Sequence, residues 1–168
     1  MRPRKQDTQQ LDKQPAIYIR VSTDKQVKSG LGLEDQKVKT LAEAQRLGLT
    51  IKPEYIFVDE GISGKKAENK RPNFGKLMEQ VKAGLISHVI VNDLSRLGRS
   101  VRLISEAIVA LEANNTAFVS VKESFNTTHA MGKAMLNMVA TFAQLESDLA
   151  SERTEDALDQ RGDKHGYK

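Results

Sequence analysis

The chain has 168 residues, of which 39% are hydrophobic, enough for a single globular domain with its own core. It contains no cysteine, which excludes disulfides, thiolate zinc sites and thiol nucleophiles. Its three histidines (His88, His129 and His165) lack the spacing of metal ligands, so we assign no metal. The net charge of +4 is compatible with a nucleic-acid partner. No apolar run is long enough to cross a membrane, and we expect a cytoplasmic protein.

Residues 1–15 are polar and end at Pro15, so we expect them to form a flexible arm. Apolar segments of two kinds then alternate along the chain. Strands are predicted at 16–21, 54–59, 88–93 and 116–121, with helices between them at 33–48, 72–84 and 101–114. Pro72 suits a helix start, and Gly48 and Gly84 suit helix ends. This order predicts an α/β fold with a largely parallel sheet.

Two helices carry apolar stripes that indicate what they contact. The helix at 33–48 is expected to bury one face, formed by Leu33, Val38, Leu41, Ala42 and Leu47. A long helix over 131–161 carries a heptad seam, formed by Met131, Met135, Met138, Phe142, Leu145 and Leu149. Such a helix would be about 45 Å long, longer than a small domain can cover. We therefore expect the seam to pack against a partner helix.

Polar side chains gather where the predicted strands end. Arg20 and Ser22 end the first strand, Asp59 ends the second, and Asp93 ends the third. The segment LSRLGRS follows with Arg96 and Arg99, and Arg71 closes the loop after the second strand. Sites in parallel sheets lie at the carboxyl ends of the strands, so these groups should meet at one edge. An arginine on the buried face of a strand needs an anionic partner or a cleft there.

A serine among arginines, without histidine, cysteine or metal ligands, suits phosphoryl transfer better than acyl transfer. Acyl transfer needs a base beside the nucleophile. Phosphoryl transfer depends on positioning and on stabilising charge on the non-bridging oxygens, which guanidinium groups match in pairs. A structural interpretation is equally open on spacing alone, because Thr23 with Gln26 fits a helix capping box and loop arginines are usually solvated.

Five segments resemble the catalytic domain of serine site-specific recombinases, the resolvase, invertase and phage-integrase family. They are YIRVSTDKQ, GLEDQ, VDEGISG…KRPNF, VNDLSRLGRS and HAMGKAMLNMVATFAQLESDLASER, in that order from Ala16 to the end of the long helix. The long loop before RPNF and the AMGKAML helix start look closer to large serine recombinases of the integrase and transposase type. The resemblance implies a resolvase-like three-layer domain (16–130) with a mostly parallel sheet of four to five strands, followed by a long oligomerisation helix (131–161).

The resemblance also implies an activity and its residues. Such enzymes cleave and rejoin double-stranded DNA through a 5′-phosphoserine intermediate, without cofactor or metal, as homodimers that assemble into homotetramers. By position, Ser22 is the nucleophile, and Arg20, Arg96 and Arg99 bind the phosphate. Supporting positions are matched by Tyr18, Gln26, Gln36, Asp59 and Arg71. Glu152 and Arg153 match a pair on the long helix that borders the DNA and the partner subunit, and the heptad seam becomes the subunit interface.

The chain departs from the family pattern in two places. Many members have aspartate, a candidate proton donor, where this chain has Ser95; Asp93 lies two residues earlier, so the acid and base assignments stay open. The tail at 162–168 leaves no room for the DNA-binding domains of the family, so we expect a catalytic fragment or a short form that relies on a partner for targeting.

Two other functions are weighed against the recombinase. One is a non-catalytic dimerisation or regulatory module derived from a recombinase. An intact set of Arg20, Ser22, Arg96 and Arg99 argues against it, because an idle site has no reason to bury arginines. The other is a phosphate-binding regulator, which ranks last because no glycine-rich phosphate loop follows the first strand.

Overall fold

The computed structural model describes residues 12–21, 31–60, 71–98 and 100–162. Five strands form one sheet in the order β2-β1-β3-β4-β5. They are β1 (Gln14–Val21), β2 (Ile56–Glu60), β3 (Ile86–Val91), β4 (Ala117–Ser120) and β5 (Phe125–Asn126). The first four pair in parallel, as predicted, and β5 pairs antiparallel with β4. The two-residue β5 was not among the predicted strands; it is too short to show alternation.

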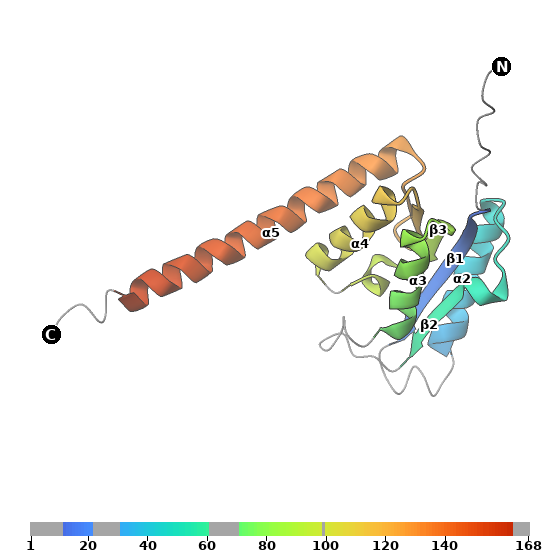
Figure 1. Ribbon diagram of the computed structural model, residues 1–168, viewed down its shortest axis with the longest axis horizontal. Helices are drawn as coiled ribbons and strands as arrows, with labels where there is room; N and C mark the ends of the chain where they lie inside the picture. Colours follow the sequence, from blue (N-terminus) through green and yellow to red (C-terminus); the bar gives the residue numbers. More distant parts are fainter. Residues whose placement is uncertain (1–11, 22–30, 61–70, 99, 163–168) are drawn as a thin grey trace, which may run out of the picture.

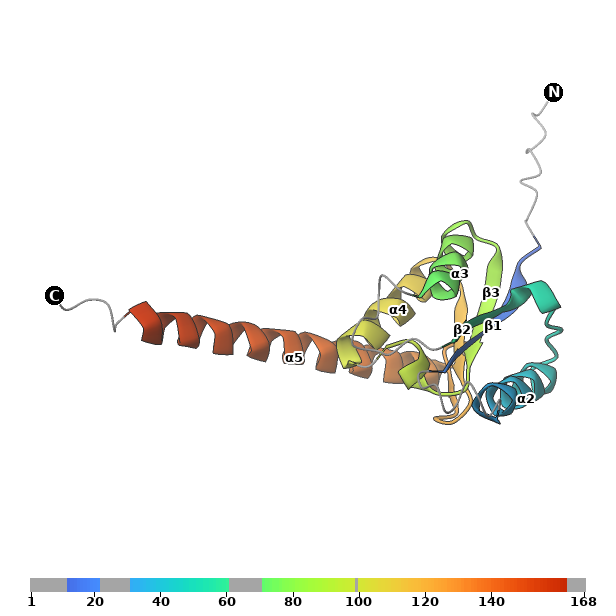
Figure 2. The ribbon, with the colours of Figure 1, turned by 90° about the horizontal axis from the view of Figure 1, so that it is seen from below.

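Helices cover both faces of the sheet, which makes three layers (Figures 1 and 2). α2 (Leu31–Arg46) covers one face, and α3 (Pro72–Lys82) and α4 (Val101–Ala113) cover the other. Because strand side chains alternate, β1 supplies both cores. Ala16 and Tyr18 pack with α3 and α4, whereas Ile17 and Ile19 pack on the α2 side. A short 3-10 helix, η1 (Pro53–Tyr55), precedes β2.

The buried face of α2 differs from the predicted one. Val38 is 63% exposed and Ala42 is also exposed, so neither belongs to the apolar face. Gln36, Thr40 and Ala44 are buried instead. Thr40 is accommodated because its hydroxyl donates to the carbonyl of Gln36 at 2.7 Å. The expectation failed because two polar residues occupy core positions that a hydrophobic pattern assigns to apolar side chains.

Local signals placed the helix ends correctly. Gly48 and Gly84 adopt φ angles of 73° and 74°, the left-handed conformation that glycine favours after a helix. Pro72 is the first residue of α3. At the start of α4, the Ser100 side chain accepts a hydrogen bond from the Leu103 amide at 3.2 Å. Residues within or next to each helix therefore mark these helix ends.

The long helix α5 (Ala130–Gly162) begins and ends within one residue of the predicted 131–161. It contacts α4 and β5 near its start, and its distal half projects away from the sheet (Figure 1). Gly132 permits this attachment, because a Cβ there would lie 1.8 Å from the Asn126 carbonyl oxygen. No helix among the described segments is long and apolar enough to span a membrane.

Candidate active site

The carboxyl edge of the sheet gathers most of the predicted site residues that the structure describes. Arg20, near the end of β1, is 5% exposed, and its Nη2 donates to the Ser95 carbonyl at 2.7 Å. Ser95 belongs to the 3-10 helix η3 (Leu94–Arg96), which follows β3. We call residues 94–97 the Arg96 turn. β1 and the Arg96 turn are therefore joined directly at this edge.

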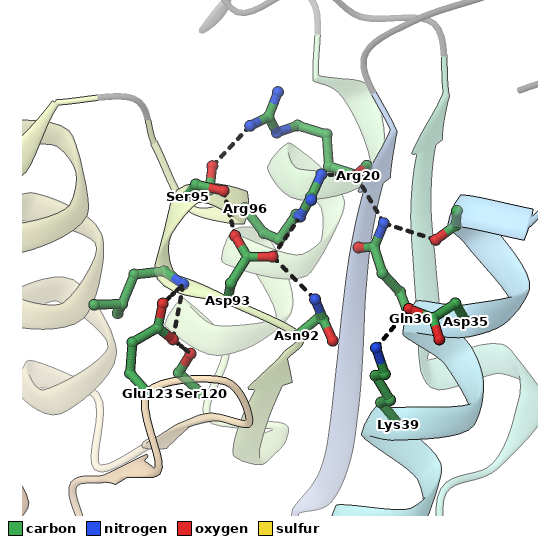
Figure 3. A network of polar contacts seen from close by, with 12 residues as sticks. Arg20, Asp35, Gln36, Lys39, Asn92, Asp93, Ser95, Arg96, Ser120 and Glu123 are labelled. Atoms are coloured by element: carbon green, nitrogen blue, oxygen red, sulfur yellow. Dashed lines mark hydrogen bonds and ion pairs between the residues drawn. The ribbon is translucent and has the colours of Figure 1, made fainter. Parts of the chain in front are cut away.

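Two side chains hold the backbone carbonyl of Arg20 from different elements (Figure 3). Gln36 Nε2, on α2, donates to it at 3.3 Å and also donates to the Gly32 carbonyl at 2.9 Å. Arg96 Nη1 donates to the same Arg20 carbonyl from the Arg96 turn. The Gln36 side chain is buried, and its Oε1 accepts no hydrogen bond within the described part of the chain. The end of β1, one residue before position 22, is thus fixed from both sides.

Asp93 orients the Arg96 guanidinium. Its carboxylate accepts hydrogen bonds from Ser95 Oγ, from Arg96 Nε at 3.1 Å and from Asn92 Nδ2 at 3.0 Å. Burial acts to raise the pKa of Asp93, but the hydrogen bonds from Ser95 and Asn92 and the charge of Arg96 hold that pKa below its ordinary value. Asp93 is therefore ionised at neutral pH and suits the positioning of Arg96 better than the donation of a proton.

Asp59 lies at the carboxyl edge of the sheet and also caps the start of α3. Its carboxylate accepts from the backbone amides of Asn73 at 3.1 Å and Phe74 at 3.0 Å, so it caps a helix whose own N-cap residue, Arg71, makes no capping bond. The Tyr18 hydroxyl donates to the same carboxylate at 3.0 Å. Burial raises the pKa of Tyr18, with a smaller contribution from the negative charge of Asp59, so its hydroxyl stays protonated.

The side chain of Arg71 points into the protein interior. It is 7% exposed and its guanidinium carbon lies 4.0 Å from the centre of the Phe74 ring. Its Nε donates to the Tyr18 hydroxyl at 3.0 Å, and its Nη1 and Nη2 donate to the carbonyls of Leu97 at 2.7 Å and Arg96 at 2.8 Å. Arg71 thus supports the Arg96 turn through its backbone. Leu97, 2% exposed, anchors the same turn in the core.

The remaining predicted residues fall into three groups. Ser22, Gln26 and Arg99 lie outside the described residues. Glu152 and Arg153 are exposed on the part of α5 that projects from the domain, so the structure does not bring them to Arg20 and Arg96 (Figure 1). The seam side chains are also exposed, from 42% for Leu149 to 73% for Met131.

Sequence reasoning missed one contributor to this edge, Glu123. Its carboxylate accepts from the Ser120 hydroxyl and from the backbone amide of Leu94. No spacing or motif singled it out, because the contact joins segments 29 residues apart. No cluster of three or more His, Asp or Glu residues in the described segments could hold a metal ion.

The fold is that of serine recombinase catalytic domains. The N-terminal catalytic domain of TP901-1 integrase is 30% identical, superposes with a TM-score of 0.71, and the match covers 82% of this chain and 99% of that one. A resolvase family site-specific recombinase from Streptococcus pneumoniae is 22% identical, with a TM-score of 0.69 over 89% of this chain and 99% of its own, and shares the fold.

Sequence comparison identifies the family. Residues 15–167 match the family model described as "Resolvase, N terminal domain". The chain therefore belongs to the resolvase family of serine recombinases.

Curated relatives agree with this assignment. Serine recombinase PinR of Escherichia coli strain K12 is 31% identical over 84% of this chain and 66% of its own length. DNA-invertase hin of Salmonella typhimurium is 34% identical over 82% of this chain and 63% of its own length. A putative DNA recombinase of Bacillus subtilis strain 168 is 30% identical over 83% of this chain but only 26% of its own length. The chain thus spans about two thirds, or less, of the curated relatives it matches.

Proposed function

We propose that this domain cleaves and rejoins double-stranded DNA, with Ser22 as the nucleophile and Arg20, Arg96 and Arg99 as phosphate-binding groups. The observation that supports this most strongly is the pair of hydrogen bonds that join the Arg20 and Arg96 segments at the end of β1. It brings two guanidinium groups to the strand end that leads into Ser22. Within the described residues, Arg96 donates through Nε to Asp93 and through Nη1 to the Arg20 carbonyl, so its guanidinium is oriented from two sides.

The proposed reaction exchanges one phosphoester bond for another, so the number of bonds to phosphorus does not change. Ser22 Oγ forms a bond to the phosphorus as the bond to the 3′-oxygen breaks, which leaves a 5′-phosphoserine ester and a free 3′-hydroxyl. The serine loses its proton and the leaving 3′-oxygen gains one. Charge that builds on the non-bridging oxygens is stabilised by arginines already held in place by protein contacts. Rejoining is the reverse step, with a 3′-hydroxyl attacking the phosphoserine, so the ester keeps the energy of the broken bond.

We further propose that two copies associate through the α5 seam and that dimers pair as tetramers on DNA. Six large apolar side chains along α5 are between 42% and 73% exposed, and they repeat every three or four residues. A regular apolar stripe of this kind is typical of helix–helix packing. Three of its members are methionines, which adapt to changes in packing. A second copy would bury this stripe.

The test is to trap the covalent intermediate. The wild-type chain and the Ser22→Ala variant are each incubated with labelled DNA duplexes that have a randomised centre. A chelator is present throughout. The products are then separated on denaturing gels. We expect a protein–DNA adduct with the wild type and none with Ser22→Ala. Mass spectrometry should place the phosphodiester on Ser22. The control Ser87→Ala, at the other end of the sheet, should keep the adduct. A chain that folds and binds DNA without a Ser22-dependent adduct would favour the dimerisation module.

A further inference from the structure

The turn after β4 lies along the segment that carries the Arg96 turn. We call residues 121–124 the Glu123 turn. The amides of Val121 and Lys122 donate to the carbonyls of Val91 and Asn92 at 3.0 and 2.9 Å. The first bond is accepted by the last residue of β3 and the second lies beyond both strands, so the parallel pairing of β3 and β4 continues past the end of β4. The Glu123 turn is therefore aligned with the chain immediately before the Arg96 turn.

Glu123 extends this alignment by one more contact. Its two carboxylate oxygens lie 3.4 and 3.3 Å from the backbone nitrogen of Leu94, the first residue of η3. The Ser120 hydroxyl donates to Oε2 and fixes the carboxylate from the other side. In Figure 3, Glu123 and Ser120 lie on the side of Asp93 opposite to Gln36. The amide at the start of the Arg96 turn thus has a charged acceptor supplied by another element.

This contact adds to the other contacts that support the Arg96 turn. Arg71 holds its end through the carbonyls of Arg96 and Leu97, and Asp93 holds the Arg96 side chain. Glu123 holds its beginning, through Leu94. A turn of only a few residues has few internal hydrogen bonds, so its conformation depends on such external partners.

We propose that Glu123 is a positioning residue for the phosphate-binding Arg96, acting through the Leu94 amide. This inference rests on the proposed function of Arg96 in DNA cleavage. Glu123 touches no reacting atom. Its removal leaves the Leu94 amide without its charged acceptor and frees the start of the turn, which lowers the fraction of molecules with Arg96 in the productive arrangement. The Glu123→Gln variant keeps an oxygen that can accept from Leu94, whereas Glu123→Ala keeps none.

The first measurement is amide hydrogen exchange by NMR on the whole chain, which does not require the reaction. We expect Glu123→Ala to speed exchange at Leu94 roughly tenfold, the scale of one hydrogen bond to a charged group, while Ile90 in β3 exchanges at the wild-type rate. Glu123→Gln should retain most of the protection. Glu112→Ala, which removes an exposed acid on α4, is the matched control and should change neither rate. Equal Leu94 exchange in wild type and Glu123→Ala would overturn the proposal.

The second measurement is the rate of adduct formation on the same DNA. Glu123→Ala should slow it roughly tenfold, and Glu123→Gln should restore it to near the wild-type rate, with equal DNA affinity in all three proteins. Faster Leu94 exchange with an unchanged rate would also overturn the proposal, because Glu123 would then hold the turn without serving Arg96. Absence of adduct from the wild type would instead contradict the proposed function, and the exchange result would still test the contact.

Discussion

Arg20 and Arg96 each donate a hydrogen bond to the backbone of the other's segment. Arg20 Nη2 reaches the Ser95 carbonyl at 2.7 Å, and Arg96 Nη1 reaches the carbonyl of Arg20 itself. The two residues are 76 positions apart in the chain. The arrangement fixes two guanidinium groups relative to each other before any substrate binds, and fixed donors cost no reorganisation when charge develops.

Arg96→Lys is expected to lower the rate of adduct formation by about 10²–10³, by analogy with the removal of one transition-state donor. A lysine ammonium cannot reproduce the planar fork that reaches Asp93 and the Arg20 carbonyl together. The free energy of unfolding, measured by urea titration, should fall by only about 1–2 kcal/mol. Arg102→Lys, at an exposed pair with Glu106 on α4, should leave both quantities near wild type. A wild-type cleavage rate in Arg96→Lys would contradict the assignment.

Arg71→Lys is expected to lower the free energy of unfolding by about 3 kcal/mol. The change removes a buried guanidinium and leaves the carbonyls of Arg96 and Leu97 without their donors. Urea titration measures the loss, and Arg46→Lys is the control because Arg46 pairs with Glu43 on the exposed surface of α2. Equal stability of the two variants would show that Arg71 is not a structural support.

Phe142→Glu is expected to shift the chain toward monomer without loss of stability. Phe142 is 55% exposed on the α5 seam, so the monomer loses little packing, whereas a paired seam would have to bury the new charge. Sedimentation velocity at several concentrations gives the association constant. Gln144→Glu, at an exposed position outside the seam, introduces the same charge and should leave association unchanged. Identical association of Phe142→Glu and wild type would exclude the seam as the interface.

The stability of the fold should decrease as the pH falls below about 6.5. Burial lowers the pKa of His88 in β3 below its ordinary value of 6.5, so the unfolded chain takes up a proton before the folded chain does. The contribution of the neutral His88 to the free energy of unfolding is therefore fully present above that pH and is lost on acidification. His88→Asn should flatten urea-derived stabilities between pH 7.5 and 5. A second loss, below about pH 4, should remain, because the lowered pKa of Asp93 makes its ionised form stabilising. An unchanged slope in His88→Asn would contradict the first assignment.

Much of the fold could be predicted because its signals are local. The positions of Gly48, Gly84 and Pro72 marked helix ends and a helix start, since backbone conformation restricts which residues fit there. The helix predicted at 131–161, whose first half carries the apolar repeat from Met131 to Leu149, matches α5 to within one residue at each end. The meeting of Arg20, Asp93 and Arg96 at one edge followed from a general property of parallel sheets, in which carboxyl ends of strands lie together.

What the sequence by itself determined, then, is the order of helices and strands, the edge where the polar residues meet and the family to which the motifs belong. Only the tertiary structure decided the partner of each polar side chain. It buried Gln36 and left Val38 exposed, it turned Arg71 toward the carbonyls of the Arg96 turn, and it brought Glu123 to Leu94. Periodicity and spacing report the geometry of one segment, whereas these contacts join residues that are 16 to 29 positions apart and depend on how the layers pack.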